Sequence, residues 1–357
     1  MLNNPLPEFW HGKRVVLTGH SGFKGSWLTL WLQQLGAKVT GISLEPETQP
    51  SLSSLLEVES SCAHHTLDIR DLAAIKRCIK AADPEIIFHL AAQPLVRLSY
   101  REPVDTFSTN VMGTVNMLEA MRDCPSLRAA VMVTTDKVYH NNEWEYPYRE
   151  TDALGGHDPY SASKAASEIA IACYRASFLT QQGVAVGIAR AGNVIGGGDW
   201  SQDRLLPDAV RAWQSGETLQ IRRPQAIRPW QHVLEPLLGY LTLAEQLFAN
   251  PEKGDAYNFG PAPHEAATVK EVVELARSIY KTGQVEYGNG QEGPHEASWL
   301  ALETTKARLT LGYRPRWNLQ ISVARTVSWY QHHYSGTAAL ALCLRDIQAF
   351  TDSRAID

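Results

Sequence analysis

The sequence predicts an α/β fold, in which a doubly wound parallel sheet carries a smaller, mostly helical second domain. Three observations lead to this prediction. Short apolar strand patterns alternate with helical patterns over the first 190 residues. A glycine-rich loop separates the first strand pattern from the first helical pattern. After residue 190 a proline- and arginine-rich stretch appears, and helical patterns predominate.

The strand patterns are near-continuous apolar runs, which are typical of parallel strands that are buried on both faces. The first run is followed by apolar residues at helical spacing, which end at Gly36. The expected strands are 14–18, 38–44, 86–90, 129–133 and 184–189. The expected helices are 71–82, 104–122, 160–180, 233–248, 269–280 and 319–330, with one more in the apolar tail after residue 336.

A chain of 357 residues is long enough for two domains. We assign residues 1–190 to a dinucleotide-binding domain and residues 191–357 to a substrate-binding domain. The strand-like run 256–260 could rejoin the first domain, which would interleave the two.

Composition narrows the class of protein. The formal net charge of -5 shows no basic footprint and argues against nucleic acid as a partner. We expect no membrane partner, because no apolar run approaches the length of about 18 residues that a spanning helix needs. Five scattered cysteines without a CxxC pair indicate reduced thiols in a cytoplasmic protein, with no metal site.

The glycine loop, with the spacing GxxGxxG, indicates a Rossmann-type dinucleotide site. Gly19 permits the tight turn, Gly22 lets the backbone approach a pyrophosphate, and Gly25 lets the helix pack closely. Ser43 ends the second strand, Glu45 follows, and no arginine is placed for a 2′-phosphate. NAD is therefore favoured over NADP.

Further cofactor contacts are expected along the same sheet edge. Asp68 is placed to cap the adenine, although a role as an N-cap or turn residue is a serious rival. The expected NAD-binding residues are Gly19, Ser21, Gly22, Phe23, Lys24, Gly25, Ser43, Asp68, Ile69, Leu90, Ala91, Ala92, Thr134, Tyr160 and Lys164.

Tyr160 and Lys164 stand four residues apart and therefore share one face of a helix. A nearby ammonium favours the phenolate, so we expect the pKa of Tyr160 to fall toward neutrality and the tyrosine to act as a base. The spacing alone is weak, and a core-edge aromatic is the alternative. It becomes specific because it follows a glycine loop and the Thr135–Asp136 pair.

Together these residues resemble the extended short-chain dehydrogenase/reductase family, in the branch that acts on nucleotide sugars. The resemblance covers nearly the whole chain and rests on the glycine loop, the Tyr/Lys pair and the segments 89–93, 110–113, 190–196 and 257–260. Thr135-Asp136-Lys137 is similar to the Thr-Asp-Glu signature of sugar-nucleotide 4,6-dehydratases. Epimerases of the branch usually carry Ser-Ser or Thr-Ser there.

This chain has Lys137 where the signature has Glu. Together with His20, Lys24 and the segment 197–200, this lysine makes the chain resemble the members of the branch that act on CDP-glucose. That resemblance implies a lyase that retains NAD and makes CDP-4-dehydro-6-deoxyglucose, the first committed step toward dideoxy sugars of lipopolysaccharide O-antigen. The implied catalytic residues are Thr135, Asp136, Lys137, Tyr160 and Lys164.

The resemblance also implies a role for each catalytic residue. Tyr160 takes the C4 hydroxyl proton while NAD accepts hydride, and Thr135 hydrogen-bonds that hydroxyl. A base removes the C5 proton, Asp136 protonates the departing C6 hydroxyl, hydride returns to C6, and C5 is reprotonated. Lys137 is either the C5 base or a cation that stabilises the enolate. For Thr135 and Asp136 the alternative is ordinary hydrogen bonding at a strand end.

The nucleotide end of the substrate needs cationic donors. By family position Arg228 is the best candidate for the diphosphate, whereas solvated arginines are an equal alternative for Arg204 and Arg222. For His232 a core histidine is as good a reading. The expected substrate-binding residues are Gln93, Asn193, Arg204, Leu206, Pro207, Ile221, Arg222, Arg228 and His232.

The same residues are compatible with other functions, and two helices favour an oligomer. The alternatives are a TDP- or GDP-sugar 4,6-dehydratase, a nucleotide-sugar epimerase or decarboxylase, and a non-catalytic dinucleotide-binding scaffold. Apolar residues on helices 104–122 and 160–180 favour a homodimer, or a tetramer, through a four-helix bundle. They are Val111, Val115, Leu118, Ile169 and Ala172.

Overall fold

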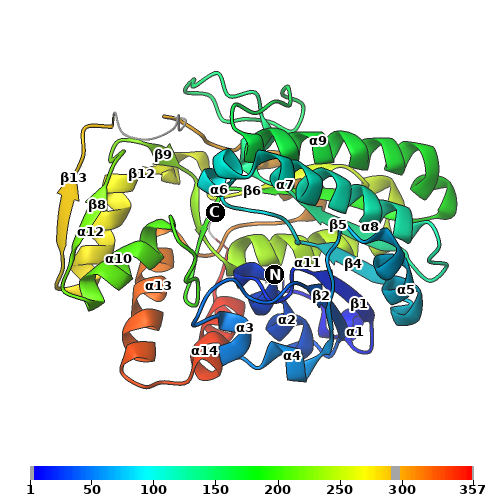
Figure 1. Cartoon of the computed structure of the whole chain (residues 1–357), viewed down its shortest axis with the longest axis horizontal. Coiled ribbons are helices and arrows are strands. Elements are labelled where there is room, and N and C mark those ends of the chain that lie inside the picture. Colours follow the sequence, from blue (N-terminus) through cyan, green and yellow to red (C-terminus); the bar gives the residue numbers. More distant parts are fainter. Residues whose placement is uncertain (1–3, 291–297, 356–357) are drawn as a thin grey trace.

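The computed structural model describes residues 4–290 and 298–355. Its centre is a seven-stranded sheet in which every strand pairs in parallel with its neighbours, in the order β11-β6-β5-β4-β1-β2-β3 (Figure 1). The strands are β1 (Arg14–Thr18), β2 (Lys38–Ser43), β3 (Ala63–Thr66), β4 (Ile86–His89), β5 (Ala129–Val133), β6 (Ala185–Ala191) and β11 (Ala256–Phe259).

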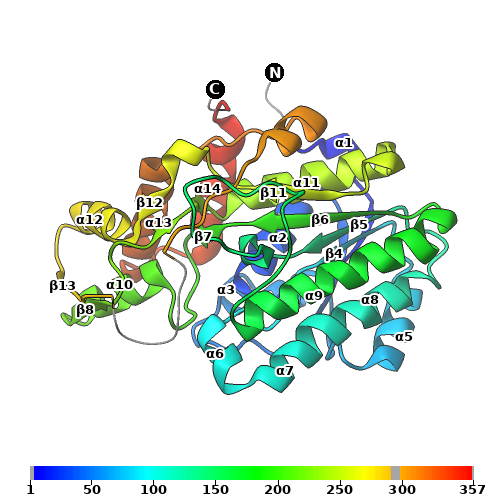
Figure 2. The same ribbon diagram turned by 90° about the horizontal axis from the view of Figure 1, so that it is seen from above.

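Helices cover both faces of this sheet, as the turned view shows (Figure 2). Successive side chains of β1 point to opposite faces: Val15 and Leu17 pack with α2 (Phe23–Gln34) and α11 (Leu234–Ala249), and Val16 packs with the other layer. That other layer contains α5 (Leu72–Ala82), α7 (Pro103–Phe107), α8 (Gly113–Met121) and α9 (Pro159–Tyr174). The short helices are α1 (Pro7–Trp10), α3 (Leu52–Leu55), α4 (Val58–Ser61) and α6 (Val96–Arg101).

A smaller lobe lies beside the carboxyl edge of the sheet, at the left of Figure 1, and has its own apolar core. Its helices are α10 (Leu205–Gln214), α12 (Val269–Tyr280) and α13 (Leu319–Tyr334). Its strands form three two-stranded pairs: β7 (Asn193–Ile195) with β10 (Trp230–His232), β8 (Thr218–Ile221) with β13 (Gln284–Tyr287), and β9 (Ile227–Arg228) with β12 (Ala267–Thr268).

Two elements from after residue 190 lie on the large sheet. β11 pairs with β6, and α11 packs against β5 and β6. The tail forms α14 (Ala339–Asp352), which packs against α13 and α3. Within the described residues, no helix combines the length and the apolar character needed to cross a membrane.

The predicted α/β architecture is confirmed, and two of the expected helices differ in detail. The helix expected at 104–122 is interrupted by a π-helical turn at Ser108–Met112, and the one expected at 160–180 ends as a π-helical turn at Arg175–Leu179. The first turn aims the buried Asn110 at two neighbours: its side chain bonds the backbone of Gln93 and the hydroxyl of Ser163. The small strands of the lobe were not predicted, because runs of two to four residues carry too little periodicity.

Candidate active site

The glycine loop connects the end of β1 to the start of α2. Gly19 has a φ of 74°, and a Cβ there would come within 2.8 Å of the backbone nitrogen of Ala91. Gly22, in contrast, faces open space apart from the Gly19 carbonyl. No side chain caps the first N–H groups of α2, so they stay available to an anion. These features fit the pyrophosphate of a dinucleotide.

At the end of β2, two serine hydroxyls meet beside this loop. The Ser21 and Ser43 hydroxyls are hydrogen-bonded to each other, and Ser21 also donates to the carbonyl of Leu44 over 2.9 Å. Glu45 accepts a hydrogen bond from Thr66 on β3. A hydroxyl and a carboxylate therefore stand where a ribose would lie, and no arginine takes part in these contacts.

Asp68 takes the alternative role, that of a turn residue. Its carboxylate accepts from the backbone N–H of Arg70 and pairs with that guanidinium at 2.6 Å, and these hydrogen bonds lower the pKa of Asp68. Ile69 is buried and packs closely against Gly113 of α8. The Asp68 side chain is still 31% exposed, so its contact with the adenine, like that of Ile69, stays a prediction beside these structural roles.

The Thr135-Asp136-Lys137 segment forms a short turn directly after β5. Thr135 caps this 3-10 turn, and its hydroxyl donates to Asp136 Oδ1 over 3.0 Å. The Lys137 ammonium, 29% exposed, pairs with the same oxygen at 3.1 Å and lies 3.4 Å from the amide oxygen of Asn193. Asp136 is 0% exposed, and its Oδ2 has no hydrogen-bond partner among the described residues. A buried carboxyl oxygen is thus left unsatisfied at the turn.

Tyr160 lies in the first turn of α9, because Pro159 opens the helix and Asp158 caps it by accepting from the N–H of Ser161. Burial raises the pKa of Tyr160 to about 12, although the neighbouring Thr135 hydroxyl and the charge of Arg204 work to lower it. The prediction that its pKa falls toward neutrality is therefore wrong for these residues by themselves. Desolvation of the phenolate outweighs the nearby cations.

Lys164 lies one helical turn farther along α9, and its ammonium donates to the carbonyl of Val133 over 3.0 Å. Burial lowers its pKa to about 8, against the opposing charge of Glu168. Lys24, in the glycine loop, is half-buried and lies near the same groups. Burial, with the charges of Lys164 and Arg204, lowers the pKa of Lys24 to about 7. Three lysines thus converge on the turn after β5.

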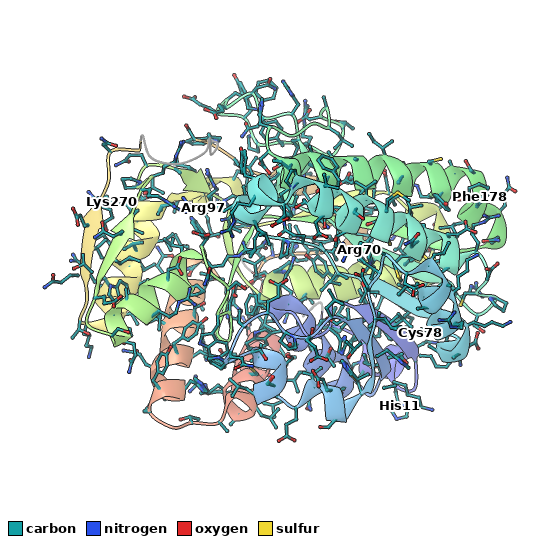
Figure 3. The ribbon with its side chains drawn as sticks, in the orientation of Figure 1. His11, Arg70, Cys78, Arg97, Phe178 and Lys270 are labelled. Carbon is teal, nitrogen blue, oxygen red and sulfur yellow. The ribbon has the colours of Figure 1, made fainter. Side chains whose placement is uncertain are left out.

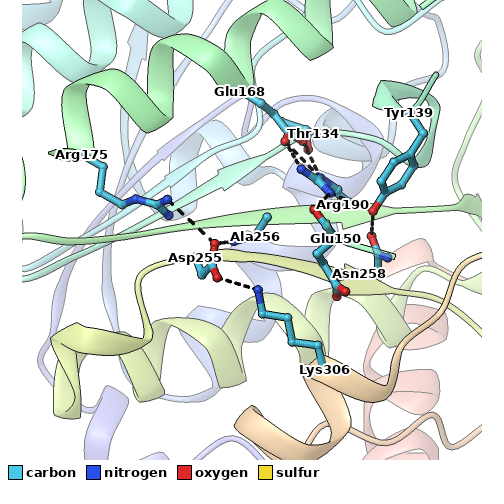
Figure 4. A network of polar contacts seen from close by, with 10 residues as sticks. All are labelled: Thr134, Tyr139, Glu150, Glu168, Arg175, Arg190, Asp255, Ala256, Asn258 and Lys306. Carbon is cyan, nitrogen blue, oxygen red and sulfur yellow. Dashed lines mark hydrogen bonds and ion pairs between the residues drawn. The ribbon is translucent and has the colours of Figure 1, made fainter. Parts of the chain in front are cut away.

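A buried polar network holds these elements together (Figure 4). Glu168 of α9 accepts from the Thr134 hydroxyl at 2.6 Å and forms an ion pair with Arg190 of β6. Arg190 donates to the Tyr139 hydroxyl, which donates in turn to the amide oxygen of Asn258 on β11. The network connects α9, the strands β6 and β11, the residue after β5 and the turn that carries Lys137, so it fixes their relative positions.

A cavity of about 210 Å³ opens between α6, the start of α9 and the smaller lobe. It brings together five predicted site residues: Lys137, Asn193, Arg204, Arg222 and Arg228. Loops and helix ends supply lining residues that sequence reasoning missed, namely Arg97, Asn141, Asp158, Ser161 and Asp203. Figure 3 shows Arg97 on the side of α6 that faces the smaller lobe. No motif marks these residues, since their positions depend on loop paths.

Other predicted substrate residues lie elsewhere. Leu206 and Ile221 belong to the apolar core of the smaller lobe, and Pro207 is buried beside them. Gln93 uses its side-chain amide on Leu95 and Thr106, so it shapes the loop before α6. None of these four lines the cavity. These contacts give each of the four a structural role, and their predicted contacts with a substrate stay predictions.

His232, for which two readings were open, does not line the cavity either. It is fully buried between Trp27 and Trp317, and burial lowers its pKa to about 3. Its Nδ1 accepts from the N–H of Leu234 at the start of α11. Of the two readings of this residue, the core histidine is the one that the structure supports.

Comparison with known proteins gives consistent results. Residues 16–326 match the GDP-mannose 4,6 dehydratase family. A CDP-glucose 4,6-dehydratase of Salmonella typhimurium is 44% identical over 349 residues, which cover 96% of this chain and 97% of that protein. A dTDP-glucose 4,6-dehydratase of Xanthomonas campestris is 26% identical over 335 residues, 88% of this chain and 92% of that protein. A solved dTDP-glucose 4,6-dehydratase of Bacillus anthracis in complex with NAD superposes with a TM-score of 0.76 at 22% identity, over 91% of this chain and 99% of that one.

Proposed function

The chain belongs to the GDP-mannose 4,6 dehydratase family, and from that premise we propose that it converts CDP-glucose to CDP-4-dehydro-6-deoxyglucose and water. The observation that carries the proposal is the Asp136–Lys137 ion pair beside Tyr160, with the buried Oδ2 of Asp136 unsatisfied. An enzyme that only oxidises C4 needs the tyrosine as a base. Elimination of water also needs an acid for the departing hydroxyl and a base or a cation for C5, and Asp136 and Lys137 can supply these.

The first step is oxidation at C4 of the glucose. Thr135 and Tyr160 hold the C4 hydroxyl, and Tyr160 takes its proton. The glycine loop would hold NAD, which would supply a reversible hydride acceptor: hydride would leave C4 and return at C6 as C5 is reprotonated, and the oxidised ring would add a positive charge that favours the phenolate. The Lys164 ammonium, with its pKa near 8, is charged at neutral pH and adds to that effect. The cofactor is regenerated within each turnover and is not consumed.

Elimination follows from the acidity that the C4 ketone confers on C5. Asp136 delivers a proton to the departing C6 hydroxyl, and Oδ2 is the atom for this, since Oδ1 already accepts from Thr135 and Lys137. Lys137 reaches into the cavity beside Asn193 and acts at C5, either as the base or as the cation that stabilises the enolate. Asp136 is buried, which limits the access of water to its carboxyl group.

The nucleotide end is held by arginine. Arg228, 8% exposed, lines the cavity together with Arg204 and Arg222, and a guanidinium can bind a diphosphate through two parallel hydrogen bonds. Asn193 lies close to Lys137 and so contacts the sugar or its phosphate.

The test is incubation of the purified protein with CDP-, dTDP-, UDP- and GDP-linked hexoses, followed by product analysis by NMR. We expect a 4-keto-6-deoxy product from CDP-glucose. An epimerised sugar without a 4-keto group would instead assign the chain to the epimerases. Turnover of dTDP-glucose in preference to CDP-glucose would keep the reaction and change the substrate.

We also propose that the protein acts as a homodimer in the cytoplasm, in the synthesis of deoxy sugars for lipopolysaccharide. Val104 and Ile169 are 80% and 64% exposed on neighbouring helices, and Ala172 is exposed beside them. Leu118, in contrast, belongs to the core under the sheet and is corrected from the predicted interface. The five free cysteines are consistent with a reducing compartment. A monomer in light scattering at micromolar concentration would contradict the dimer.

A further inference from the structure

Asp203 lies in the cavity between two arginines that come from different parts of the chain. Its Oδ1 is 3.2 Å from a guanidinium nitrogen of Arg97 on α6 and 3.9 Å from one of Arg222, which follows β8. Its side chain stays 43% exposed in this position. Carboxylate and guanidinium groups thus stand side by side on the cavity wall, one accepting hydrogen bonds and the other donating them.

The Oδ2 atom of Asp203 has no hydrogen-bond partner within residues 4–290 and 298–355. Other oxygen acceptors on the cavity wall are engaged. Both carboxylate oxygens of Asp158 cap α9 through the backbone and hydroxyl of Ser161, and the Asn141 amide oxygen accepts from Tyr148 and Glu143. The carboxylate of Asp203 is therefore the one in this wall with an oxygen open to a ligand.

The backbone of Asp203 supports a role in binding. Its φ is 59°, in the left-handed region that side chains other than Gly, Asn and Asp rarely adopt. Such a conformation persists where the surrounding structure imposes it. In this conformation the carboxylate lies beside Arg97 and Arg222.

We propose that Asp203, with the guanidinium beside it, recognises the cytosine base, an inference that rests on the proposed function. This proposal puts the sugar and the diphosphate against Lys137, Asn193 and Arg228, all of which line the cavity. The base then lies against Asp203 and the guanidinium of Arg97, which is the closer of the two arginines. Cytosine presents an amino donor at N4 next to an acceptor at N3, and carboxylates accept from that amino group. An acceptor next to a cationic donor matches this edge.

Uracil and thymine invert both positions. They present the O4 acceptor where cytosine has its amino group, and an N3–H donor where cytosine has an acceptor. Their O4 would face the carboxylate of Asp203, and their N3–H would face a guanidinium. The same two groups therefore form hydrogen bonds with cytosine. With uracil or thymine they would place acceptor against acceptor and donor against donor, which disfavours binding of those bases.

The experiment measures binding of CDP, UDP and dTDP to the wild type, to Asp203→Asn and to Asp208→Asn by isothermal titration calorimetry. Asparagine tolerates the left-handed backbone and presents an amide that can rotate its N–H₂ group toward O4. Asp208, on α10, pairs with Arg211 and does not line the cavity, so it controls for the loss of a negative charge in this segment. Melting temperatures and NAD binding confirm that each variant is folded.

We expect Asp203→Asn to weaken CDP binding by about 10- to 100-fold while UDP binding stays equal or improves. The Asp208→Asn variant should keep the wild-type preference. Equal weakening of all three nucleotides would overturn the proposal and show that Asp203 only orients the arginines. An unchanged CDP preference in Asp203→Asn, or no preference in the wild type, would overturn it too.

The binding experiment tests the role of Asp203 separately from the proposed dehydration of CDP-glucose. If the wild type prefers CDP and Asp203→Asn loses that preference, the assignment of Asp203 stands even if no 4-keto sugar forms. If the 4-keto product forms from CDP-glucose but the preference survives in the variant, the proposed function stands and the assignment of Asp203 fails.

Discussion

Two clusters of ionisable groups show shifts in pKa that have the same main cause, burial, and different consequences. The catalytic cluster contains Tyr160 and Lys164, whose pKa values move to about 12 and about 8. The junction cluster consists of His232, Glu235, Arg316, Arg325 and Asp346. Burial raises the pKa of Glu235 to about 8 and that of Asp346 to about 6.

The difference lies in what surrounds each cluster. Glu235 accepts from the backbone N–H groups of Arg316 and Trp317, and Arg316 in turn donates to the carbonyl of Phe350 on α14. These contacts dock the tail onto the fold, and no member of the junction cluster lines the cavity. Tyr160 and Lys164 do not line the cavity either, but the turn beside them carries Lys137, which does. A shifted pKa by itself therefore marks burial, and it becomes evidence of a site where the neighbouring groups open to a cavity.

The largest expected effect is a loss of turnover when the catalytic cluster is changed at Tyr160. Tyr160→Phe should lower kcat by about 100- to 10,000-fold, because the phenol oxygen that takes the C4 proton is lost. NAD and nucleotide binding should change little, since the ring and Lys164 remain. The measurement is steady-state kinetics with binding titrations of the same preparation. Near-wild-type turnover would remove Tyr160 from the mechanism.

A smaller effect is expected at Lys137, and it distinguishes the two roles left open for this residue. Lys137→Ala should slow C5 exchange and elimination by about 100-fold, because either a base or a cation is lost. Lys137→Glu should keep measurable dehydration if a base is required, but not if a cation is. Loss of deuterium from C5-labelled substrate reports this step. If Lys137→Ala turned over normally, the residue would be structural.

Matched arginine variants sharpen the contrast further. Arg228→Met should weaken nucleotide diphosphate binding by about 10- to 100-fold, because it removes a bidentate partner from the cavity wall. Arg325→Met should leave that affinity unchanged and lower the melting temperature, since it leaves the buried carboxylate of Asp346 without its partner at 3.3 Å. Both are read by calorimetry and thermal unfolding. Equal affinity losses in the two variants would contradict the division into clusters.

The smallest expected effect concerns stability against pH. The folded-state pKa of Glu235 is near 8 and its unfolded value is about 4.3, so the folded protein binds the extra proton between these values. This contribution is fully present below pH 4 and is lost as the pH rises through 8. Glu235→Gln should therefore show a smaller fall in melting temperature between pH 5 and 9 than the wild type. Its kcat should match the wild type at each pH.

The sequence by itself determined the sheet, the glycine loop and the Tyr160/Lys164 pair. These features depend on local spacing: alternating apolar strands, a loop between strand and helix, and two residues one helical turn apart. The Asp136–Lys137 ion pair is likewise between neighbours in the chain. Because these features join residues that are close in the chain, they can be predicted without knowing how distant segments pack.

Which side chains reach the cavity depends on the tertiary structure. The pKa of each buried group depends on it as well. His232 is sealed between Trp27 and Trp317, and the pKa of Tyr160 rises although Lys164 follows one turn later. Asp203 meets Arg97 across 106 positions of sequence, and Tyr139 meets Asn258 across 119. Solvation and long-range contacts set these environments, and neither has a local sequence pattern, because both depend on how distant segments pack.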